Sequence, residues 1–65
     1  MLTKLTYSDG EETWINPDYV VGVDSATDEH KRIDGEAKAV VRMHDGDIGI
    51  FPQAPDEIAK RLNNG

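Results

Sequence analysis

The sequence predicts an α+β fold, in which a small, twisted antiparallel sheet of four to five strands is followed by one short C-terminal helix. Two Asp-Gly pairs, at residues 9–10 and 45–46, each lie between short stretches in which apolar and polar side chains alternate. Such pairs favour the tight turns of β-hairpins. After residue 54 the apolar spacing becomes that of an amphipathic helix. The pattern leaves open whether the sheet curls into a partial barrel.

The first hairpin is predicted from strands at about residues 2–7 and 12–16. Leu5 and Tyr7 share one face of the first strand, whereas Trp14 points away from the face that carries Ile15 on the second. We expect a curled sheet to bury Trp14 as part of the core. A contact with a ligand or a partner is the alternative, because tryptophan is enriched at binding hot spots.

Asn16-Pro17-Asp18 predicts a second reversal, because proline fixes φ and Asn and Asp side chains bond to their own backbone. A third strand is expected at about residues 20–24, with Val21 and Val23 facing the core. Gly22 within it indicates a bend, a bulge or a close approach of another group. Residues 25–36 are polar and are expected to form a flexible loop, with a short helical turn as an option.

The second hairpin is predicted from strands at about residues 37–44 and 47–51. Phe51 is expected on the face opposite Ile48 and Ile50, together with Trp14, either inside a curled sheet or in a contact between subunits. A helix at about residues 55–63 begins at a proline that suits the first helical position, and its apolar stripe must dock on the sheet or on another subunit. Residues 1–65 therefore form a single domain, and the predicted core consists of Leu5, Tyr7, Ile15, Val21, Val23, Val41, Met43, Ile48, Ile50, Ile58 and Leu62.

The chain has 65 residues, no cysteine and a formal net charge of −6, from 13 acidic and 7 basic side chains. A chain this short has a thin margin of stability, and without disulfides we expect a homodimer or small homo-oligomer. No more than two basic residues are adjacent in the sequence, and this lack of clustered positive charge disfavours direct binding to nucleic acid. No apolar run reaches the roughly 20 residues of a membrane span, and no secretory leader is recognisable, so we expect a cytoplasmic protein.

No motif for catalysis, metal binding or cofactor binding is recognisable. The glycines form no phosphate-binding pattern, and a calcium loop starting at Asp24 would have Glu29 where glycine is required. His30 and His44 each lie in or beside a turn, where a solvated histidine is the ordinary expectation. We therefore expect no catalytic residues, no metal ligands and no cofactor, and we predict that the chain is not an enzyme.

Three segments together resemble the FlbD/SwrD-like family of small bacterial flagellar and swarming-motility proteins. They are Leu-Thr-Lys-Leu-Thr-Tyr-Ser-Asp-Gly at residues 2–10, Trp-Ile-Asn-Pro-Asp at residues 14–18 and Pro-Asp-Glu-Ile at residues 55–58. The insert at residues 25–36 is longer than in that family, and the start of the helix differs. The resemblance implies the same order of strands and helix, a bacterial or phage-encoded origin, and no catalytic residues.

The function expected first is a non-enzymatic protein-binding module that acts on a host protein complex through an edge strand or through a face containing Trp14 and Phe51. A second possibility is an oligomer that binds a small ligand or nucleotide between subunits, with Trp14 stacking and Arg42 pairing with charge. A third is an acidic mimic of nucleic acid. The candidate contact residues are Trp14, Tyr19, Arg42 and Phe51.

Overall fold

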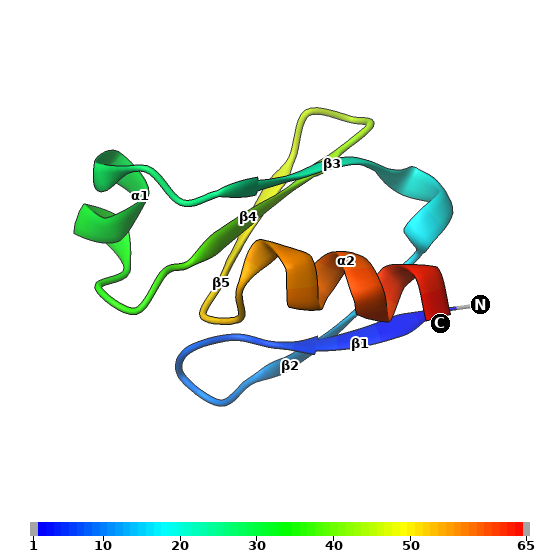
Figure 1. The fold of residues 1–65 in the computed structure, drawn as a ribbon, viewed down its shortest axis with the longest axis horizontal. Coiled ribbons are helices and arrows are strands. Elements are labelled where there is room, and N and C mark those ends of the chain that lie inside the picture. Colours follow the sequence, from blue (N-terminus) through cyan, green and yellow to red (C-terminus); the bar gives the residue numbers. More distant parts are fainter. Residues whose placement is uncertain (1, 65) are drawn as a thin grey trace.

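The computed structural model describes residues 2–64 and confirms the α+β class. Two antiparallel sheets are present within these residues, one of order β1–β2 and one of order β3–β4–β5, and they do not close into a barrel (Figure 1). The elements are β1 (Thr3–Thr6), β2 (Glu12–Ile15), the 3-10 helix η1 (Pro17–Tyr19), β3 (Val20–Ser25), α1 (Asp28–Ile33), β4 (Ala39–Met43), β5 (Ile48–Phe51) and α2 (Pro55–Asn64).

Both Asp-Gly pairs form the predicted hairpin turns, and they do so with the same local chemistry. Gly10 and Gly46 have φ values of 91° and 93°, in the left-handed region that glycine adopts without steric cost. The carboxylates of Asp9 and Asp45 accept hydrogen bonds from the backbone N–H two residues on, at 2.9 and 3.0 Å. These local bonds fix the register of β1 with β2 and of β4 with β5.

The predicted reversal after the first hairpin is η1, and it leads directly into β3. The side chain of Asn16 accepts a hydrogen bond from the N–H of Asp18, and proline takes the first helical position. β3 pairs with β4 through Val20 opposite Met43 and Gly22 opposite Arg42, so Val21 is an extra, bulged residue. The bulge leaves Val21 62% exposed, and its predicted place in the core is wrong.

The predicted loop at residues 25–36 contains a short helix, α1, which begins after Thr27. The Thr27 hydroxyl accepts from the backbone N–H of His30, and the Nδ1 atom of His30 accepts from the backbone N–H of Thr27 at 3.1 Å. This reciprocal arrangement is a capping box in which histidine takes the place of the usual Glu or Gln. Ile33, the one large apolar residue of the segment, is 73% exposed.

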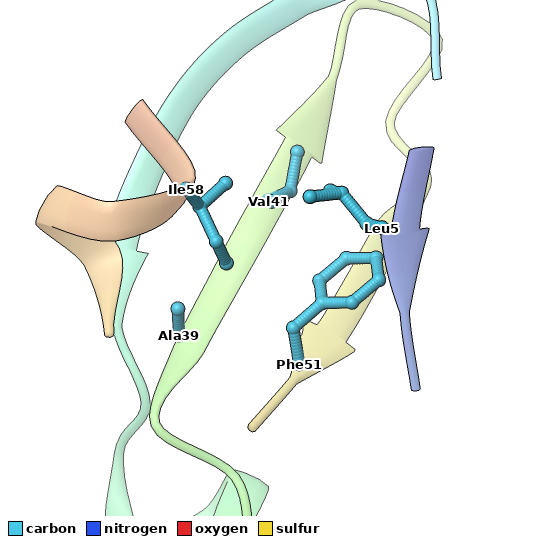
Figure 2. Close-up of a cluster of buried hydrophobic side chains, with 5 residues drawn as sticks. All are labelled: Leu5, Ala39, Val41, Phe51 and Ile58. Atoms are coloured by element: carbon cyan, nitrogen blue, oxygen red, sulfur yellow. The ribbon is translucent and has the colours of Figure 1, made fainter. Parts of the chain in front are cut away.

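The core lies where β1, α2 and the inner face of the β3–β4–β5 sheet meet. Figure 2 shows the five side chains at its centre pointing toward one another from four elements. They are fully buried and are Leu5, Ala39, Val41, Phe51 and Ile58. Ile58 is the buried member of the predicted helical stripe, and Leu62, one turn later, packs partly against the same cluster. α2 thus docks on the sheet, as its spacing predicts.

The predicted facing of β5 is wrong. Phe51 pairs with Ala39, and Gly49 pairs with Val41, so these positions face the core. Ile48 and Ile50 consequently lie on the outer face of the sheet, where Ile48 is exposed. A strand with apolar residues on both faces has no alternation to tell which face is inside, and the pairing with β4 decides it.

Replacing Gly49 with alanine is expected to destabilise the fold by about 1–3 kcal/mol. A Cβ atom at residue 49 would lie 2.7 Å from Cε2 of Phe51, so this fully buried ring would have to shift from its stacked position on Tyr7. Gly35→Ala is the matched control, because a Cβ there has no heavy atom within 4 Å. Urea unfolding followed by circular dichroism measures both variants. Equal midpoints for the two variants would contradict the tight packing of the Phe51 ring.

Candidate functional site

The outer side of the β1–β2 hairpin carries an exposed surface that we call the Trp14 face, made of Leu2, Lys4, Glu12 and Trp14. Lys4 lies opposite Trp14 in the strand register, on the side away from the Leu5–Thr13 pair that faces inward. Trp14 is 62% exposed and Leu2 is 53% exposed. The Lys4 ammonium and the Glu12 carboxylate pair across the strands at 2.9 Å. The predicted burial of Trp14 in the core is therefore wrong.

The Trp14 face is a candidate binding surface because it leaves the large indole side chain of Trp14 in water. Single exposed apolar residues are common, but an indole exposes a large area that gains free energy when another surface covers it. The adjoining ion pair holds two polar groups in place beside the indole. An apolar centre with a polar rim is the usual arrangement at a protein–protein interface.

Tyr19 lies elsewhere, at the end of η1. Its ring packs edge-on against the imidazole of His44, with ring centroids 4.7 Å apart and an interplanar angle of 78°. Its carbonyl oxygen accepts a hydrogen bond from the backbone N–H of His44 at 2.9 Å. Tyr19 is exposed, but its contacts join the start of β3 to the end of β4.

Arg42 lies on the outer face of the β3–β4–β5 sheet, in an ion pair with Asp24. The distance from Arg42 Nε to the Asp24 carboxylate is 2.6 Å. The guanidinium covers Gly22, where any Cβ atom would collide with it. Gly22 therefore lies next to a bulge and also allows the close approach of the Arg42 side chain. These are two of the three alternatives that the sequence left open for this glycine. An anionic ligand at Arg42 would have to compete with the carboxylate of Asp24.

Phe51 is fully buried and stacks on Tyr7, with centroids 4.9 Å apart and an interplanar angle of 8°. The expectation that Phe51 shares an outer face with Trp14 is wrong. The four residues predicted for contacts thus occupy the hairpin's outer side, the end of η1, the outer side of the larger sheet and the core. Within one chain the fold does not gather them into a single site.

A groove that the sequence did not predict lies between β3 and the C-terminal half of α2. Its volume is about 210 Å³. The spacing of Ala59 and Leu62 on the helix is a signal for one wall, but the sequence does not show which strand lies beside that wall. The lining residues are Pro17, Val20, Val21, Gly22, Val23, Ala59, Leu62 and Asn63.

The turn of the first hairpin is tied to the end of α1 by a hydrogen bond between side chains. The Ser8 hydroxyl donates to the Asp34 carboxylate at 2.5 Å, and the backbone N–H of Glu36 donates to the other carboxylate oxygen at 3.0 Å. The bond from Ser8, and then the bond from Glu36, hold the pKa of Asp34 below its ordinary value because both stabilise the ionised form.

Among residues 2–64, no three His, Cys, Asp or Glu side chains are grouped closely enough to hold a metal ion. The helices described in this range are too short or too polar to cross a bilayer. Comparisons with protein-family models, with curated proteins and with solved structures found no match to this chain. The resemblance to the FlbD/SwrD-like family therefore stays a prediction that depends on the three sequence segments alone.

Replacing Ser8 with alanine is expected to raise the pKa of Asp34 toward 3.8, its ordinary value. A carboxyl group whose pKa is lowered by folding stabilises the fold above the unfolded-state value, and this stability is lost as pH falls through the folded-state value. Ser8→Ala should therefore lose less stability than the parent chain on acidification from about pH 5 to about pH 2.

Carboxyl NMR titration measures the pKa directly, and urea unfolding at several pH values measures the stability. Ser25→Ala is the control, since this serine is exposed at the end of β3. An Asp34 carboxyl that titrates identically in the parent chain and in Ser8→Ala would exclude the hydroxyl as the cause of the lowered pKa.

Proposed function

We propose that this chain is a non-enzymatic protein-binding module that docks its Trp14 face on a partner protein. The observation that carries the proposal is the 62% exposure of Trp14 on a paired strand whose position is fixed by the Asp-Gly turn. The backbone of a paired strand is already ordered, so covering the indole restricts little more than its two side-chain torsions. Rigid aromatic side chains of this kind contribute a large share of binding energy at interfaces.

The surroundings of Trp14 support the same proposal. Leu2, which directly precedes β1 and continues its alternation with Lys4, adds exposed apolar area, and the Lys4–Glu12 ion pair lies beside Trp14. Charges at the edge of an interface set orientation and association rate more than affinity. A partner surface with an apolar pocket, flanked by groups that can bond to an ammonium and a carboxylate, would match this arrangement.

The sequence left two other functions open, and neither gains a specific observation. A ligand site built from Trp14, Tyr19 and Arg42 needs a second subunit to bring these separated positions together. A nucleic-acid mimic needs acidic groups arranged along one surface, and three carboxylates are already paired with Lys4, Arg42 and Arg61. Self-association stays a prediction, which native mass spectrometry of the purified chain tests directly.

Trp14→Ala is expected to weaken binding of the physiological partner by about 30-fold or more, which corresponds to about 2 kcal/mol. The partner would be captured on the immobilised parent chain, identified and purified, and its dissociation constant measured by calorimetry. Ile33→Ala is the matched control, because Ile33 is a large apolar residue outside the Trp14 face that is 73% exposed. Circular dichroism should show both variants folded.

Equal affinity of Trp14→Ala and the parent chain would overturn the proposal. So would an equal loss of affinity in Trp14→Ala and Ile33→Ala, because it would show a general response to removing apolar surface rather than recognition through the Trp14 face.

A further inference from the structure

The β3 strand is an open edge of its sheet. The order β3–β4–β5 pairs one side of β3 with β4 and, among the described residues, leaves the other side without a partner strand. Such an edge presents backbone N–H and C=O groups at the spacing that another extended chain can match. An edge of this kind either is protected or is used for binding.

The groove described above runs along this edge and has a helix as its other wall. α2 contacts β3, β4 and β1, and Figure 1 shows it running between the larger sheet and the β1–β2 hairpin. Val20, Val23 and Leu62 line the groove and also pack against the core, but each is only partly buried. The core is thus incompletely covered along this line, and an apolar side chain placed there would extend it.

We propose that the β3–α2 groove binds an extended, basic segment of a protein partner as an additional strand along β3. The free edge would supply hydrogen bonds between main chains, and alternate side chains of the segment would enter the groove between Val23 and Leu62. β3 spans six residues, which sets the length of segment that it can pair with. This surface shares no residue with the Trp14 face, so either proposal can fail while the other holds.

Charge favours a basic segment over a second copy of the chain. The chain has a net charge of −6, and three of its seven basic side chains, Lys4, Arg42 and Arg61, are already paired with carboxylates. Two copies that met at this groove would each bring that negative charge, and they would repel one another.

The negative charge near Pro17, at one end of the groove, indicates where the basic residue of the bound segment would lie. Asp18 is exposed there, and the last turn of α2, with the partial negative charge of a helix C-terminus, lies at the same end. Lys60 adjoins Ala59 nearer the other end, so we place the Lys or Arg of the segment beside Asp18.

The bulge in β3 is compatible with this binding mode. Bulges on edge strands deter the indiscriminate pairing that leads to aggregation, because they twist the edge and interrupt its hydrogen-bonding pattern. Here the bulge also places Val21 on the surface, where it is exposed next to the groove. A partner segment of suitable side chains would contact Val21, whereas an arbitrary flat strand would meet an irregular edge.

The test is a selection of a phage-displayed library of random twelve-residue peptides against the full chain. Selected peptides should contain alternating apolar residues with Lys or Arg at one end. Fluorescence polarisation with the synthetic peptides should show that Ala59→Arg, which fills the helical wall of the groove, weakens binding at least about tenfold. Trp14→Ala is the matched control and should leave the affinity unchanged.

Two further measurements keep the test independent of any effect of Ala59→Arg on folding. Val21→Lys changes an exposed side chain and should also weaken a basic peptide, because like charges repel. Peptides methylated at alternate backbone nitrogens should lose affinity if they bind as a strand.

Four outcomes of the peptide experiments would overturn the proposal. They are a selection without binders, peptides that bind both groove variants as tightly as the parent chain, peptides that lose affinity only with Trp14→Ala, and peptides unaffected by backbone methylation. Native mass spectrometry tests whether a second copy of the chain occupies the groove instead. A dimer of the parent chain that Ala59→Arg converts to monomer would assign the groove to a second copy and would equally overturn the proposal.

Discussion

The burial of the Phe51 ring is the contact on which the rest of the fold depends. Phe51 ends β5, yet its ring reaches Leu5 of β1 and Ile58 of α2 in one cluster and stacks on Tyr7 beyond the end of β1. The two sheets share no strand pairing, so side-chain contacts of this kind hold them together. Gln53, two residues later, adds a hydrogen bond to the carbonyl of Thr6 at 3.1 Å. Residues near the end of β5 thus join β1 to β5 and α2, which lie far from β1 in the sequence.

The choice of which strand faces pack into the core also determines which side chains are exposed. Strand side chains alternate, so fixing Leu5 and Phe51 inside places Lys4, Trp14 and Ile48 outside. A chain of 65 residues has a single small core, and these three side chains lie outside it and are exposed. The exposure of Trp14 is therefore a direct consequence of the register of the first hairpin, and not of any local irregularity in β2.

Features determined by neighbouring residues could be predicted from the sequence, and features determined by distant pairing could not. The Asp9–Gly10 and Asp45–Gly46 turns, the reversal at Pro17 and the docking stripe of α2 depend on residues within one turn of each other. The facing of β5 and the bulge at Val21 depend on how these strands meet β4. Burial of Trp14 was expected inside a curled sheet, but the sheets do not close and the β1–β2 register places Trp14 outside.

The same distinction between neighbouring residues and distant pairing applies to the candidate surfaces. The sequence identified Trp14 as a contact residue because tryptophan is rare and large, and the fold leaves it accessible. It identified Arg42 as a contact residue because of its charge, but the carboxylate of Asp24 that pairs with it comes from another strand. The β3–α2 groove could not be predicted from the sequence, because its formation depends on both the order of the strands and the position of the helix.

The groove also links binding to stability. Val20, Val23 and Leu62 are both the incompletely covered margin of the core and the lining of the groove. A segment that covers them would bind the folded chain and not the unfolded one, and at a hundred times its dissociation constant it would add about 2.7 kcal/mol to stability. For a chain with so small a core this is a substantial share of the whole. The Trp14 face has no such contact with the core cluster, so its occupation would depend on the fold without completing it.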